Sequence, residues 1–148
     1  MTVVDKRLVA GFTLIELMIV VLIVAILAAV AVPIFRGRMD AAKWSEGRAG
    51  AGTIASSIRA YAAEKGDFAS FNPDLVTDLG FGVNELDGTY FLQASYTATA
   101  SCAAGQVAFS IVVDPGGGKG RATAPTAPAT MTLAANAGNN YVATWSQN

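Results

Sequence analysis

The sequence predicts an α+β fold, in which a long N-terminal helix packs on a C-terminal antiparallel sheet of three or four strands. Residues 12–33 are strongly apolar, and a narrow apolar stripe with helical spacing follows over 34–65. Residues 89–148 contain several short runs that alternate between apolar and polar side chains, which is the pattern of half-buried strands. Residues 66–88 are expected to form a connecting loop with a short helix.

The apolar stretch is the most informative part of the chain. From Phe12 to Val32 it contains one charged residue, Glu16. As a helix it would be about 30 Å long, which is enough to cross a bilayer. A carboxylate in that setting is unfavourable, and a plain anchor does not need one. Glu16 is therefore expected to have a specific partner.

The residues around Glu16 follow a recognisable pattern. Gly11 begins the string Gly-Phe-Thr-Leu-Ile-Glu, and Pro33 follows the apolar run. Over about residues 6–40 the chain closely resembles type IV prepilins and the pseudopilins of type II secretion. The remaining residues resemble these proteins only in general layout.

This resemblance implies a role for each part of the N-terminal region. Residues 1–11 would be a leader, which prepilin peptidase removes by cutting between Gly11 and Phe12, and Phe12 would then be N-methylated. Residues 12–33 would span the bacterial inner membrane in the precursor and later form the core of an extracellular or periplasmic filament. Glu16 would pair with the N-terminal amine of a neighbouring copy, which makes both charges tolerable in an apolar core. Assembly would also need inner-membrane machinery.

Two other interpretations of this region remain open. Glu16 could serve its own chain, either by meeting the helix dipole in the first turn or by pairing with the amine of Phe12. The segment could also be an ordinary secretory signal, with an apolar centre at Leu17–Leu27 and a small-residue cleavage box at Ala29–Ala31. In that case the mature chain would begin at Val32. Glu16 is badly placed for such a signal.

The helix is expected to continue through residues 34–65 as an amphipathic half. Pro33 removes one backbone hydrogen bond and should kink it. The residues expected to pack on the sheet recur every three or four positions: Gly47, Ala51, Ile54, Ile58 and Tyr61. A further contact strip is expected at Phe35, Met39 and Ala42.

Turn and strand signals divide the rest of the chain. Gly66 should end the long helix, and Asn72-Pro73 should begin the short one, with Asn72 as its N-cap. Strands are expected at residues 90–97 and 106–113, and residues 130–133 and 141–146 should form a hairpin around an Asn139-Asn140 turn. The Gly- and Pro-rich stretch 114–128 should be an exposed loop.

Composition argues against several functions. The 148 residues include no histidine and one cysteine, Cys102, so neither a Ser-His-Asp triad nor an intrachain disulfide is possible. The glycines around Lys119 fail the phosphate-loop pattern. We expect no enzymatic activity, cofactor or metal, although Asp114 could contribute to a calcium site. Residues 66–148 carry two basic and six acidic side chains, so no nucleic-acid partner is expected.

The sequence therefore predicts a structural subunit of a type IV pilus or a type II secretion pseudopilus, and it does not separate the two. Its partners would be copies of itself and related pilins, together with the bilayer before assembly. The alternatives are an exported periplasmic binding domain with a secretory signal, and a minor pilin that binds DNA or a substrate.

Overall fold

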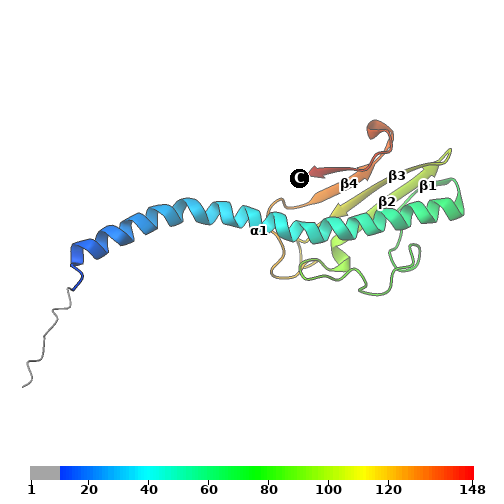
Figure 1. Cartoon of the computed structure of the whole chain (residues 1–148). Coiled ribbons are helices and arrows are strands. Elements are labelled where there is room, and N and C mark those ends of the chain that lie inside the picture. Colours follow the sequence, from blue (N-terminus) through cyan, green and yellow to red (C-terminus); the bar gives the residue numbers. More distant parts are fainter. Residues whose placement is uncertain (1–10) are drawn as a thin grey trace, which may run out of the picture. The chain divides into compact units, whose positions relative to one another are not determined.

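The computed structural model describes residues 11–148, so the predicted leader lies outside the described residues except for Gly11. The chain divides into two compact units, Met1–Arg36 and Gly37–Asn148. Helix α1 (Leu14–Lys65) belongs to both, and a five-stranded antiparallel sheet belongs to the second (Figure 1). The fold is α+β and pilin-like, as predicted.

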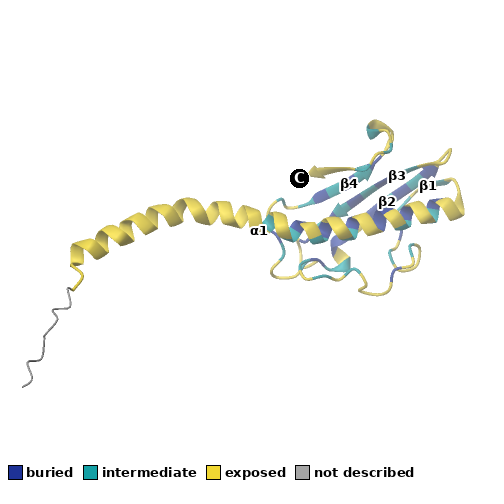
Figure 2. Cartoon of the chain, viewed as in Figure 1, coloured by how far each residue is buried: buried dark blue, intermediate teal, exposed yellow. Residues whose placement is uncertain are grey.

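In the first unit, the described apolar side chains are exposed (Figure 2). An 18-residue window of α1 has a mean hydropathy of 3.2, and none of it is buried. By length and composition this helix can cross a membrane. Pro33 lies inside α1, and its missing N–H leaves the Ala29 carbonyl without its helical partner. The kink at Pro33 stays a prediction.

In the second unit, α1 presents a narrow buried face. It contains Gly47, Ala51, Ile54 and Ile58, as predicted, and also Trp44. Tyr61 is only partly buried and packs on two aromatic rings of β1 (Phe68–Phe71).

The predicted contact strip farther up the helix is wrong. Phe35 is 66% exposed, Met39 is 45% exposed and Ala42 is also exposed. The cause is that the packed face starts later, at Trp44, whose ring lies 5.0 Å from that of Phe91.

The sheet is a simple antiparallel meander of five strands in the order β1-β2-β3-β4-β5. After β1 come β2 (Tyr96–Ala103), β3 (Gln106–Val113), β4 (Met131–Ala135) and β5 (Thr144–Gln147). The sheet has one strand more than the largest number predicted, which was four. The additional strand is β1, which lies in the segment expected to be a loop. The predicted hairpin is confirmed as the pairing of β4 with β5.

Residues 72–95 differ from the prediction in two places. No helix follows Asn72; instead, residues 75–79 form turns. Asp74 makes the capping contacts there, because its Oδ1 accepts hydrogen bonds from the amides of Val76 (2.9 Å) and Thr77 (2.8 Å). The strand predicted over residues 90–97 corresponds to β2, which begins only at Tyr96. A short 3₁₀ turn, Gln93–Ser95, precedes it.

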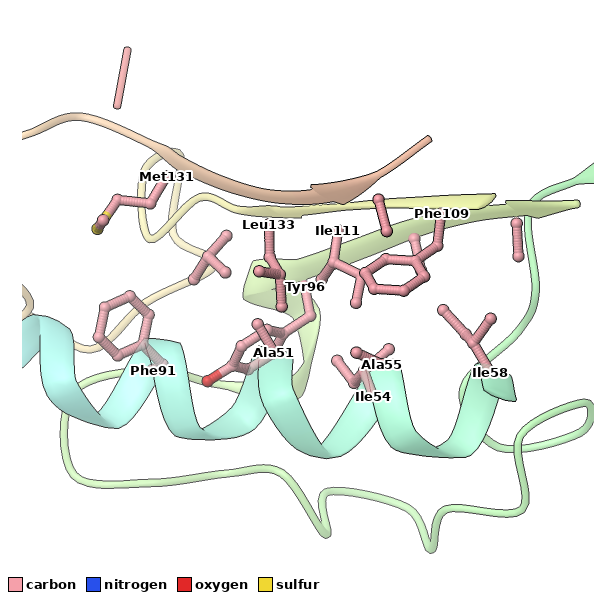
Figure 3. Close-up of a cluster of buried hydrophobic side chains, with 14 of the residues drawn as sticks. Ala51, Ile54, Ala55, Ile58, Phe91, Tyr96, Phe109, Ile111, Met131 and Leu133 are labelled. Atoms are coloured by element: carbon pink, nitrogen blue, oxygen red, sulfur yellow. The ribbon is translucent and has the colours of Figure 1, made fainter. Parts of the chain in front are cut away.

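The core of the second unit lies between α1 and one face of the sheet (Figure 3). Ile54 and Ile58 of α1 have no exposed area, and neither has Ile111 of β3. Fully burying side chains of this size contributes about 1.5–3 kcal/mol each. Residues Gly37–Asn148 therefore contain their own hydrophobic core.

Candidate functional site at the start of α1

In the first turn of α1, Thr13 and Glu16 form hydrogen bonds to each other in both directions. Glu16 Oε2 accepts hydrogen bonds from the Thr13 backbone amide (3.0 Å) and the Thr13 hydroxyl (2.7 Å). In return, Thr13 Oγ1 accepts a hydrogen bond from the Glu16 amide (3.3 Å). This is a capping box, in which two residues three apart satisfy N–H groups that the helix leaves unpaired.

Sequence reasoning missed Thr13, although its signal was present. Thr-Leu-Ile-Glu directly before an apolar run is the pattern of a capping box. Glu16 lies in the first turn of α1, and its observed partner there is Thr13, which neither local interpretation of Glu16 included.

The capping box leaves part of Glu16 free. Both donor groups of Thr13 use Oε2, and Oε1 has no hydrogen-bond partner within residues 11–148. Glu16 is exposed in the single chain. Its carboxylate can therefore accept a further donor, and an ammonium group from another molecule is chemically suited to that position.

The surroundings of Glu16 are apolar. A shallow hollow on this part of α1 is lined only by apolar residues, among them Ile15, Met18 and Ile19. Phe12 is 80% exposed. When another helix packs against this apolar surface, water is excluded from around Glu16. A positively charged group that reaches Oε1 is then attracted to the carboxylate more strongly than it would be in water.

The predicted site residues fall into two places. Gly11, Phe12 and Glu16 lie together at the N-terminal end, whereas Pro33 lies 17 residues beyond Glu16, or about 26 Å along the helix. A Cβ added at Gly11 would meet nothing within 4 Å. Nothing in the described fold therefore requires glycine at this position.

Asp114, the candidate calcium ligand, is occupied by donors. Its Oδ1 accepts a hydrogen bond from the Gly116 amide (2.8 Å), and its Oδ2 lies 3.3 Å from Lys119 Nζ. The Gly116 amide, and secondarily Lys119, hold the pKa of Asp114 below its ordinary value. No group of three or more potential metal ligands occurs within the described part of the chain.

Comparison with known proteins finds a match in the N-terminal region of the chain. Residues 6–32 match the family model of the prokaryotic N-terminal methylation motif. This motif is the signature of type IV prepilins and pseudopilins. No solved structure matches the chain.

Proposed function

We propose that this chain is a structural, non-catalytic subunit of a type IV pilus or a type II secretion-type pseudopilus. Prepilin peptidase cuts it between Gly11 and Phe12, and the new N-terminus at Phe12 is methylated. The single observation that carries this proposal is the methylation motif at residues 6–32. It coincides with an apolar helix that nothing covers in the single chain.

The helix performs two tasks in succession. In the precursor, the apolar side chains of residues 12–33 face lipid in the inner membrane, which is a stable position for them. In the filament, the same side chains pack against the helices of other copies. Glu16 sets the register, because its free Oε1 faces the Phe12 ammonium of a neighbour, and each group neutralises a charge that would be costly alone.

The N-terminus of the mature protein tests this proposal. Intact-mass analysis and N-terminal sequencing of the membrane-extracted chain should give a start at Phe12 with one added methyl group. Replacing Gly11 with leucine should leave an uncut precursor. Because the added side chain meets nothing in the described fold, such a result reports recognition by the peptidase.

Gly37→Leu is a matched control for the Gly11 variant. A Cβ at Gly37 also meets nothing within 4 Å, so this variant should be processed normally. A mature chain that begins at Val32 would instead identify a secretory signal and refute the proposal. That cut would fall inside the continuous helix α1.

A further inference from the structure

One side of α1 in the second unit carries arginines that have no acidic partner. Arg38, Arg48 and Arg59 are exposed, and none makes a salt bridge within residues 11–148. At about 100° per residue they fall within about 80° of one another around the helix. The two lysines of this helix half are different, because Lys43 pairs with Asp40 and Lys65 pairs with Glu64.

The other exposed residues on this side are small. The sequence places glycine, alanine or serine at each of them: Ala41, Ser45, Ala49, Gly52 and Ser56. We call this surface, with its three arginines, the arginine face. Small residues let another chain approach the helix backbone closely. The guanidinium of Arg59 lies 5.0 Å from the centre of the Phe109 ring, so Arg38 and Arg48 are the projecting groups.

The complementary charge lies in the segment after the helix. Residues 66–118 contain no lysine or arginine. Residues 74–87, which we call the acidic segment, contain four exposed acids that make no salt bridge within the described residues: Asp74, Asp78, Glu85 and Asp87. Each accepts a hydrogen bond from a backbone amide, so their positions are fixed by the fold.

The acidic segment runs along a different side of α1 from the arginine face. The turn at Asp78 shares a hollow with Ser57 and Ala60 of the helix. Just after the acidic segment, Glu46 accepts hydrogen bonds from the amides of Tyr90 (2.8 Å) and Phe91 (2.9 Å). Glu46 and Arg48 are two residues apart, which separates them by about 160° around the helix.

We infer that the arginine face of one copy docks against the acidic segment of a second copy. This inference rests on the proposed filament function and adds a specific contact between the exported halves. Because the two surfaces differ and lie on separate sides of one subunit, the interface is heterologous. Repeating such an interface without closing a ring produces a helical array. Exposed ion pairs are individually weak, so the contact supplies registry and partner choice more than strength.

The first experiment uses the full chain in its filament. Arg38→Gln with Arg48→Gln should lower the yield of sheared filaments by at least about fivefold, from the loss of several weak pairs. The mutant filaments should also dissociate at a lower salt concentration than wild-type filaments, because fewer ion pairs remain and salt screens each of them. Lys65→Gln with Lys119→Gln changes net charge equally and should leave both readouts near wild type.

The second experiment tests the contact directly and leaves every charge in place. In a Cys102→Ala background, cysteine is introduced at Gly52 on the arginine face and at Val83 within the acidic segment. Both positions can accept a cysteine, because a Cβ at Gly52 meets nothing within 4 Å and Val83 is 77% exposed. Oxidised filaments of the double variant should give a ladder of multimers. Each single variant should give monomers.

The outcomes separate this inference from the proposed function. Normal filament yield and salt resistance in the arginine variant, or no ladder from intact filaments of the double variant, would overturn the docking surface and leave the function standing. Dimers from Gly52→Cys alone would also overturn it, because they indicate a symmetric contact. A wild-type chain that is cleaved but never forms filaments would remove both.

Discussion

The Tyr96 ring lies directly against the backbone of Gly50, in the space that a side chain at residue 50 would occupy. A Cβ at Gly50 would stand 2.7 Å from Tyr96 Cζ and still closer to its hydroxyl oxygen. Burial, and secondarily the Glu46 carboxylate, raises the pKa of Tyr96 to about 12. Tyr96 thus stays neutral at physiological pH. Its ring packs on α1 at the point where β2 begins.

This contact predicts opposite effects for two neighbouring glycines. Gly50→Ala should destabilise the second unit by about 1–2 kcal/mol, because the overpacking cost of about 1–3 kcal/mol exceeds the gain in helix propensity. Gly52→Ala meets nothing within 4 Å, so it should stabilise the unit by about 0.5–1 kcal/mol. Thermal melts of a soluble fragment lacking residues 1–39 measure both effects. Equal shifts in the same direction would contradict the close approach of Tyr96.

Regular periodicity explains which elements could be predicted. Strand β3 alternates without interruption, and Phe109, Ile111 and Val113 are buried on one face as the pattern required. The helix stripe succeeded for the same reason, since Ile54 and Ile58 recur at helical spacing. Both elements keep one conformation from end to end, so a local pattern determines which side chains face the core.

The failures lie where the chain changes direction. The pattern over residues 90–97 resembles one strand, yet Phe91 is fully buried beside Trp44 before β2 begins. Glu46, 44 residues away from Tyr90, holds that segment through backbone amides. Local sequence carries no signal for such a contact. The capping box of Thr13 and Glu16 is a different case, because its spacing is visible in the sequence.

The N-terminal pair predicts that charge and capping can be separated by mutation. Glu16→Gln keeps an acceptor for Thr13 but removes the negative charge. The variant should be cleaved and inserted normally, and filament formation should drop sharply because the neighbour's ammonium lacks its counter-charge. Thr13→Ala should retain filaments, although the cap is worth about 0.5–2 kcal/mol of helix stability. Normal filament yield from Glu16→Gln, scored by electron microscopy, would refute the proposed pairing.

The buried face of α1 predicts how strongly the second unit depends on Ile58 for its stability. Ile58 has no exposed area, so Ile58→Asp places a charge in the core without a partner, and the cost should exceed about 4 kcal/mol. That is comparable with the whole stability of a small domain, about 5–15 kcal/mol. The fragment lacking residues 1–39 should therefore unfold.

Cys102→Ser is the control for Ile58→Asp in the same fragment. Cys102 is buried and forms no disulfide within the described residues. Its thiol lies 3.8 Å from Asp67 Oδ1, and a serine hydroxyl can make the same contact. Its melting temperature should stay close to that of the parent. A folded Ile58→Asp fragment with a cooperative melt would mean that this face of α1 does not carry the core.

Two turns whose backbone amides donate to a carboxylate predict how the second unit responds to acid. The amides of Gly105 and then Ala104 hold the pKa of Asp67 below its ordinary value, and the amides of Thr77 and then Val76 do the same for Asp74. A carboxylate with a lower pKa in the folded state stabilises the fold above its unfolded pKa of about 3.9. That contribution is lost as the pH falls toward and through the folded pKa, because over this range the unfolded chain binds protons that the folded protein does not.

The acid response can be tested with a variant that keeps the hydrogen bonds of one turn. In Asp74→Asn, the side-chain oxygen can still accept from Val76 and Thr77, since both bonds go to Oδ1. Combined with Asp67→Asn, it should reduce the drop in melting temperature between about pH 6 and pH 3, because two groups that take up protons on unfolding are gone. Each single variant should show a smaller reduction. If the double variant lost as much melting temperature over this range as the parent fragment, these two turns would not be the source of its acid sensitivity.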